Sequence, residues 1–338
     1  MTNSERYQRA FGHIHARSDA AARAEAALNG TPVGRRGPLK LAAVLAAVLA
    51  LLLGTAGAEL ADGAVSNLLA PLYGGAQTEL VDSIGHPVDA SATVNGYTLT
   101  ADAVIGDRHN IAVVFTLTRD DGQPIPEGLV FDDWESNAFE LSPFGGGGGG
   151  NGSNKPDPEH PDRMQFTYQW TLSGPILLRN FKLNARNLYV YDEESESRQV
   201  VAEGEWNLSF TLRYRDATVS VPVDSLTVTG PEGDEFEIKK LELSPVGLHI
   251  DAAAPNAYFG LGPDDPPDPF ASVMPGFQVL VRLADGTEVD ANRNCNMSGG
   301  GRLDAPTQKT TYDCFFDSPI PFEDIVAVVI CGTDIPVD

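Results

Sequence analysis

The histidines are the first residues of this chain to consider for catalysis or metal binding. His13 and His15 are two residues apart, a spacing that suits neither face of a helix for a shared metal ion. The chain contains no GxSxG, HExxH or Ser-x-x-Lys motif. The other four histidines share no local sequence context: His86, His109, His160 and His249. The sequence therefore predicts no enzyme activity, no cofactor and no metal site.

Acidic pairs recur along the chain and carry oxygen atoms of the kind that calcium prefers. None has the spacing of a calcium-binding loop, so we interpret them as solvated turns. The pairs are Asp120-Asp121, Asp132-Asp133 and Asp264-Asp265, with Asp268 close to the last. The formal net charge of −24 argues against nucleic acid as a ligand and mildly for a cationic one, although such charge more often only keeps a domain soluble.

Six consecutive glycines, Gly145 to Gly150, suggest phosphate binding at first sight. A P-loop requires Gly-Lys-Ser or Gly-Lys-Thr at the start of a helix, whereas prolines and acidic residues follow here. We instead expect residues 143–163 to form a disordered, glycine-rich loop between strands.

The three cysteines offer one covalent crosslink. Cys295 and Cys314 end two predicted strands that flank a polar loop, so we expect a disulfide between them. A bond from Cys295 to Cys331 and three reduced thiols are the alternatives. Closing a loop of about twenty residues would contribute roughly 3 kcal/mol in the chain-entropy model.

One apolar stretch divides the chain that carries these residues. Residues 41–58, LAAVLAAVLALLLGTAGA, contain no charge and follow Arg35, Arg36 and Lys40. A helix of this length spans about 27 Å, close to the hydrocarbon thickness of a bilayer. We therefore expect a transmembrane helix at residues 39–60. The alternatives are a signal peptide cleaved near Ala58 and a buried helix of alanine and leucine.

The charge balance predicts the orientation of that helix. Residues 1–40 carry seven basic and three acidic side chains, a net charge of +4, and the rest of the chain carries −28. The positive-inside rule then places the N-terminus in the cytoplasm and the bulk of the chain outside the cell membrane. All three cysteines fall on the outer side, where a disulfide persists.

The N-terminal tail, residues 1–38, carries a narrow apolar stripe at helical spacing, formed by Tyr7, Phe11 and Ile14. The stripe is too small to bury a core by itself. The tail either folds onto the groove of a cytoplasmic partner or lies on the membrane surface, where its arginines suit anionic headgroups.

From about Leu80 onward, apolar residues alternate with polar ones, as they do in strands with one buried face. Asn95-Gly96 and Asp285-Gly286 mark hairpin turns. We expect two antiparallel, immunoglobulin-like β-sandwiches in an all-β extracytoplasmic part. The predicted order is a tail at 1–38, a transmembrane helix at 39–60, a stalk at 61–79, a first sandwich at 80–224 and a second at 225–338.

The whole chain resembles a known protein family through its strand and turn patterns. The segments YQRAFGHIHA, VDSIGHPVDASATVNGYTLTADAVIGD, NIAVVFTLTRDDG, FEIKKLELSPVGLHI and SPIPFEDIVAVVICGTDIPV are similar to bacterial single-pass membrane proteins with an extracytoplasmic domain of unknown function. Members are regarded as anti-sigma factors, so the resemblance implies a cytoplasmic sigma factor as partner of the tail. The chain departs from better understood anti-sigma factors, because it lacks their cytoplasmic His/Cys zinc motif and its tail is short.

Two functions remain open from the sequence. In the first, the tail binds a sigma factor or another regulator while the outer domains sense an unknown extracellular ligand or signal. In the second, the chain is a cell-envelope binding or adhesion module, and the tail only sets the topology.

Overall fold

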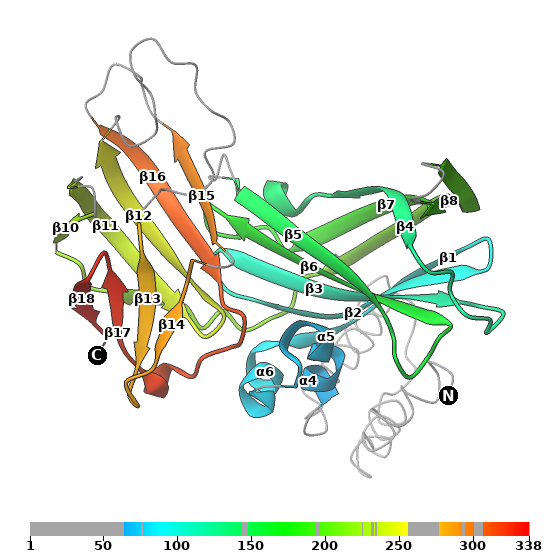
Figure 1. Ribbon diagram of the computed structural model, residues 1–338, viewed down its shortest axis with the longest axis horizontal. Helices are drawn as coiled ribbons and strands as arrows, with labels where there is room; N and C mark the ends of the chain where they lie inside the picture. Colours follow the sequence, from blue (N-terminus) through cyan, green and yellow to red (C-terminus); the bar gives the residue numbers. More distant parts are fainter. Residues whose placement is uncertain are drawn as a thin grey trace, which may run out of the picture. The chain divides into compact units, whose positions relative to one another are not determined.

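The computed structural model describes residues 64–75, 77–143, 148–192, 197–224, 226–230, 233, 235–255, 277–292, 295–300 and 307–337. Val65–Asp338 form one compact unit (Figure 1). The predicted tail, with Tyr7, Phe11 and Ile14, and the basic residues Arg35, Arg36 and Lys40 lie outside the described residues.

The predicted fold class needs a correction, because the transmembrane helix is not found. The described helices are α4 (Ala64–Leu68), α5 (Ala70–Tyr73) and α6 (Thr78–Ile84). None of them is long and apolar enough to cross a membrane. Residues 39–60, where the span was expected, fall outside the described part of the chain. The structure therefore supports a mainly β fold with a few short helices.

The prediction of a stalk at residues 61–79 is wrong for the described part of that range, because the helices there pack onto the β structure. Val65, Leu69 and Tyr73 are buried, as are Val81 and Ile84 of α6. Pro71 lies in the first turn of α5, and the left-handed Gly74 ends that helix after only four residues. The chain thus turns back on itself instead of extending as a stalk.

The first sandwich pairs a five-stranded sheet with a three-stranded one, and every pairing is antiparallel. The larger sheet runs β1 (His86–Val94), β2 (Tyr97–Gly106), β3 (Asn110–Arg119), β6 (Arg163–Leu172) and β5 (Gly148–Pro156). The smaller sheet runs β4 (Leu129–Ser136), β7 (Asn180–Asp192) and β8 (Ser197–Thr211), and the 3₁₀ turn η2 (Ala138–Leu141) follows β4.

The second sandwich is built in the same way from a six-stranded and a four-stranded sheet. The larger sheet runs β10 (Leu226–Thr229), β11 (Glu235–Ser244), β12 (Gly247–Pro255), β16 (Thr307–Phe315) and β15 (Cys295–Gly300), with β9 (Val219–Val221) on β11. The smaller sheet runs β14 (Glu288–Asp290), β13 (Val279–Leu283), β17 (Ile325–Ile330) and β18 (Thr333–Pro336), with η4 (Phe322–Asp324) before β17.

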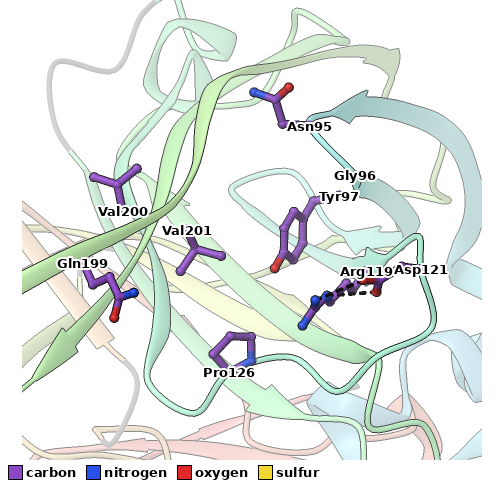
Figure 2. Close-up of a pocket in the computed structure, with 9 residues that line it drawn as sticks. All are labelled: Asn95, Gly96, Tyr97, Arg119, Asp121, Pro126, Gln199, Val200 and Val201. Carbon is purple, nitrogen blue, oxygen red and sulfur yellow. Dashed lines mark hydrogen bonds and ion pairs between the residues drawn. The ribbon is translucent and has the colours of Figure 1, made fainter.

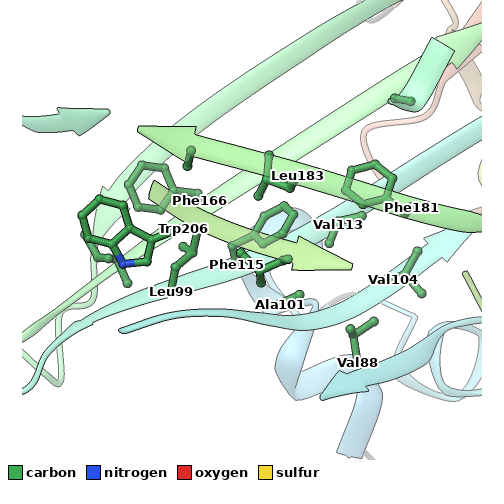
Figure 3. Close-up of a cluster of buried hydrophobic side chains, with 14 of the residues drawn as sticks. Val88, Leu99, Ala101, Val104, Val113, Phe115, Phe166, Phe181, Leu183 and Trp206 are labelled. Atoms are coloured by element: carbon green, nitrogen blue, oxygen red, sulfur yellow. The ribbon is translucent and has the colours of Figure 1, made fainter. Parts of the chain in front are cut away.

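Each sandwich has a hydrophobic core of its own. The first lies between the inner faces of its two sheets, where Phe115, Phe181 and Trp206 are fully buried (Figure 3). The second centres on residues such as Phe236 and Val279. Alternation along the strands produces both cores, because every second side chain points inward. One boundary differs from the expectation: β9, predicted as part of the first sandwich, pairs with β11 of the second.

The prediction that the glycine-rich segment is disordered is wrong for residues 148–156, because these residues form β5 at the edge of the sheet. Backbone hydrogen bonds to β6 need no side chains, and the aromatic rings of β6 cover the glycines. A Cβ atom on Gly152 would lie 2.4 Å from the Tyr168 ring, and one on Gly150 would lie 2.9 Å from the Trp170 ring. Glycine is therefore needed here for close approach of the rings, which periodicity does not reveal.

Replacing Gly152 with valine should destabilise the protein by about 1–3 kcal/mol, because the new side chain must displace the Tyr168 ring. Urea unfolding would measure the loss. Asn151→Val on the same strand is the matched control, since Asn151 is exposed. Equal stability of the two variants would show that ring packing does not explain the glycine.

The strand register supports the geometry of the predicted disulfide without testing the bond. Cys295 on β15 and Cys314 on β16 are direct Cα partners. Such partners lie about 4.5–5.5 Å apart, a separation that a disulfide spans. Cys331 lies in the turn between β17 and β18 of a different sheet. The Cys295–Cys314 bond stays a prediction, and this register favours it over Cys295–Cys331.

Candidate functional site: a buried histidine and carboxylate cluster

The structure brings together two histidines that the sequence did not connect. His109 lies between β2 and β3 of the first sandwich, and His249 lies on β12 of the second. Their rings stack with centroids 3.7 Å apart and planes inclined by 7°. We call the buried polar residues around this stack the junction cluster, which consists of Asp107, His109, Asn110, Glu242, Ser244, His249 and Asp313.

Two tight turns bring the sandwiches into contact. Asp107 accepts hydrogen bonds from the backbone amides of His109 and Asn110, each 2.7 Å long, and so fixes the turn from β2 to β3. Ser244 accepts bonds from the amides of Val246 and Gly247 in the turn from β11 to β12, and its hydroxyl donates to Asp107. Each turn is thus held by its own side chain, and one hydrogen bond joins the two turns.

Gly247 allows this close contact. A Cβ atom there would lie 2.1 Å from the carbonyl oxygen of Cys314 and 2.9 Å from the Asn110 side-chain nitrogen. Both distances are shorter than real Cβ contacts, so the position accepts only glycine without a shift of the backbone.

The second sandwich contributes its part of the cluster as a row across three neighbouring strands. Glu242 on β11 pairs in register with His249 on β12, and His249 pairs with Asp313 on β16. Directly paired residues point to the same face of a sheet. The antiparallel register therefore gathers an acid, a histidine and an acid that are far apart in sequence.

The Glu242 carboxylate connects the two sandwiches electrostatically. It lies 2.9 Å from His109 Nε2 and forms ion pairs with Arg108 and with Lys240. Burial by itself would raise the pKa of Glu242, but the hydrogen bonds from Lys240 and His109 and the charge of Lys240 outweigh burial and lower this pKa to about 2. Glu242 is therefore ionised at neutral pH although its side chain is only 1% exposed.

The two imidazoles have opposite pKa shifts. Burial acts to lower the pKa of His249, but hydrogen bonds to Asp251 and Asp313 and their charges raise it to about 9. Burial and then the neighbouring His249 charge lower the pKa of His109, against the opposing influence of nearby carboxylates. At neutral pH the stack therefore contains one imidazolium, His249, and one neutral imidazole, His109.

The nearby carboxylates also have shifted pKa values. Burial raises the pKa of Asp313, against the attraction of the two histidines. For Asp251, which faces His249 Nε2 at 3.6 Å, burial is outweighed by His249 and Lys309, and the pKa falls to about 2. His249 thus has a carboxylate at each of its two ring nitrogens, the Asp313 oxygen lying 2.6 Å from Nδ1.

His109, His249 and Asp313 have ligand atoms within 4.8 Å of one another, which raises the question of a metal ion. The ring geometry argues against a shared ion. A metal bonded in the plane of one imidazole would lie far out of the plane of the other, because the rings are stacked in parallel. The four ring nitrogens also face oxygen atoms, including the Leu172 carbonyl 3.2 Å from His109 Nδ1. These oxygen atoms can accept hydrogen bonds from protonated ring nitrogens, so the site suits bound protons better than a shared metal ion.

No local pattern in the sequence predicts this cluster. His109 and His249 are 140 positions apart in the sequence, and neither lies in a recognisable motif. The one local hint is Asp107 followed by His109 and Asn110 at the end of a strand, which is a pattern typical of a turn. The acidic pair Asp132-Asp133, interpreted as a turn, lies within β4 and pairs with arginines instead.

No protein-family model matches the chain, and no curated protein matches it. Among solved structures, the chain is similar to a conserved domain protein from Bacillus anthracis. The two are 14% identical with a TM-score of 0.46, over 73% of this chain and 76% of the other. A likeness of this size carries no argument about function.

Proposed function

We propose that this chain is a non-enzymatic sensory protein in which acidification is the signal and the junction cluster is the part that responds. The observation that carries the proposal is the stacked pair His109 and His249, because it places one titratable ring from each sandwich in direct contact. The cluster side chains are 0–3% exposed in the packed arrangement of the structure, which we call the closed junction. A substrate therefore has no access to them in the closed junction.

The expected direction of the response follows from linkage. The lowered pKa of His109 means that the closed junction binds a proton less well than an arrangement in which His109 is solvated, where the ordinary value is 6.5. The stability that neutral His109 contributes is therefore present above about pH 6.5 and is lost as the pH falls through the lowered pKa. A second imidazolium stacked on His249 would also be repelled.

Of the other cluster groups with shifted pKa values, Asp313 opposes this response, because its raised pKa means that the closed junction binds that proton more tightly than a solvated carboxyl would. The raised pKa of His249 contributes stability that is fully present below its ordinary value of 6.5 and is lost as the pH rises through about 9. Glu242 and Asp251 have lowered pKa values of about 2, so their contribution begins to fall only near the ordinary carboxyl range. Charged groups on the packed elements are Asp107 and Arg108 beside His109, Lys240 and Glu242 on β11, Asp251 on β12, and Lys309 and Asp313 on β16.

In this proposal the loosened junction would change the relative positions of the two sandwiches. The predicted tail, residues 1–38, would pass that change to a cytoplasmic partner such as a sigma factor. A second candidate function, binding of cell-envelope material, draws support from a pocket beside Tyr97 on the first sandwich.

The test is an NMR titration of the histidine rings in the full chain, combined with small-angle scattering at about pH 7.5 and about pH 5. We expect His109 to titrate below 6.5, His249 to stay protonated through neutral pH, and the radius of gyration to rise in acid. His109→Gln removes the titrating ring and should abolish the acid-induced rise, whereas His160→Gln, outside the cluster, should keep it. An unchanged radius in the wild-type chain while His109 titrates would contradict the proposal.

A further inference from the structure

A pocket of about 460 Å³ opens on the first sandwich, apart from the junction cluster (Figure 2). Three segments line it: the turn residues Asn95 to Tyr97, the residues Arg119, Asp121 and Pro126 at and after the end of β3, and Gln199 to Val201 on β8. The pocket therefore lies where the β1–β2 hairpin of one sheet meets β8 of the other, and its shape depends on the packing of both sheets.

Tyr97 presents an unused hydroxyl to this space. Its side chain is buried, with 6% exposure, and its ring points toward the middle of the pocket (Figure 2). Within the described part of the chain, no hydrogen bond to the Tyr97 hydroxyl is formed, although the Tyr97 carbonyl accepts one from Trp206. A buried hydroxyl that opens onto a pocket is available to a ligand. Burial raises the pKa of Tyr97, so this hydroxyl remains a donor at neutral pH.

Arg119 and Asp121 add a fixed pair of opposite charges. The guanidinium contacts the carboxylate twice, with Nε 2.9 Å from Oδ1 and Nη2 3.0 Å from Oδ2, and Nη1 donates to the Pro124 carbonyl. These contacts use three of the five N–H groups of the guanidinium and hold it in place. The other two N–H groups are left to donate to a ligand, and the pair is formally neutral.

The remaining polar groups can also face a ligand. The side-chain N–H of Asn95 donates a hydrogen bond to the Glu203 carbonyl, 2.6 Å away. The amide oxygen of Asn95 remains as an acceptor. Gln199 is exposed on β8 and supplies both a donor and an acceptor. Beside them, Val201 and Pro126 are partly exposed, and Val201 points toward Tyr97, so the wall is apolar on one side (Figure 2).

We propose that this pocket binds a neutral sugar residue. A sugar carries several hydroxyl groups that donate and accept at close spacing, together with apolar C–H faces, and the lining offers both kinds of partner. An anionic ligand is disfavoured, because the only charges of the lining cancel and the chain as a whole carries −24. A wholly apolar ligand would leave the Tyr97 hydroxyl and the Arg119 N–H groups unpaired.

Saturation-transfer NMR on the full chain tests this assignment, with glucose, N-acetylglucosamine and cellobiose as neutral probes and glucuronic acid as the anionic comparison. We expect signals from at least one neutral probe and weaker ones from glucuronic acid. A signal from cellobiose alone would point to a polysaccharide chain as the source, and one from a monosaccharide to a free or terminal sugar; both support the assignment.

Tyr97→Phe keeps the packed ring and removes only the hydroxyl, so binding should weaken about two- to tenfold, the value of one hydrogen bond. Tyr73→Phe removes the hydroxyl of another buried tyrosine outside the pocket and should bind like the wild type. Gln199→Ala changes an exposed position without risk to folding and should also weaken binding. The assignment is overturned if no neutral sugar gives a signal, if glucuronic acid gives the strongest one, or if both pocket variants bind like the wild type.

Discussion

Replacing Asp313 with alanine should lower the free energy of unfolding by about 3–5 kcal/mol, the usual cost of removing one partner of a buried ion pair. The Asp313 oxygen lies 2.6 Å from His249 Nδ1, and both side chains are buried. The variant leaves His249 either as a buried cation short of one carboxylate or as a neutral ring, and each state stabilises the fold less than the pair does.

The pH dependence of that loss distinguishes an ion pair from simple packing. The raised pKa of His249 contributes stability that is present below its ordinary value of 6.5 and disappears as the pH rises through about 9. The difference between wild type and Asp313→Ala in urea unfolding should therefore be larger near pH 6 than above pH 9. Asp313→Asn keeps the shape and one acceptor oxygen and should lose less.

The matched control is Asp334→Ala on β18. Asp334 forms an ion pair with Arg282, and its side chain is 54% exposed. Exposed pairs contribute about 0–1 kcal/mol, so this variant should be nearly as stable as the wild type. If Asp313→Ala costs no more than Asp334→Ala at either pH, the buried pair does not hold the second sandwich in the way we infer.

Trp206→Ala should also cost about 3–5 kcal/mol, through the core of the first sandwich. Trp206 is fully buried, its ring packs against Phe131, and its indole N–H donates to the Tyr97 carbonyl 2.9 Å away. Truncation therefore leaves a large cavity and removes the hydrogen bond that the Tyr97 carbonyl accepts from the indole.

Denaturant unfolding of two further variants separates these contributions. Trp206→Phe fills most of the volume but cannot donate the hydrogen bond, so its loss should lie between those of the wild type and the alanine variant. Phe139→Ala removes an aromatic ring that is 45% exposed and should cost far less. Similar losses for Phe139→Ala and Trp206→Ala would show that the proposed core does not dominate stability.

The way the sandwiches meet bears on how the protein would respond to its surroundings. Each has a separate apolar core, and the contacts between His109 or Asp107 and the second sandwich are hydrogen bonds, ion pairs and a ring stack. Polar contacts of this kind depend on protonation, whereas apolar burial does not. A change of pH would therefore act on the junction before it acts on the cores.

Local patterns in the sequence were enough for the β class and for most strand positions. The alternation from Met164 to Leu172 became β6, and Asn95-Gly96 became the turn between β1 and β2 with both residues at positive φ. These features depend on side-chain period and on backbone conformations that glycine and asparagine adopt easily, both of which are properties of a few neighbouring residues.

Only the tertiary structure decided the edge strand, the short helices and the junction cluster. The glycines of β5 form a strand because aromatic rings on β6 lie over them, and residues from Val65 onward pack because a sheet face receives them. His109 and His249 meet because strand register and two tight turns align Glu242, His249 and Asp313 opposite the first sandwich. Contacts between positions more than a hundred residues apart leave no local period in a single sequence, so their chemistry emerges only when the sheets are assembled.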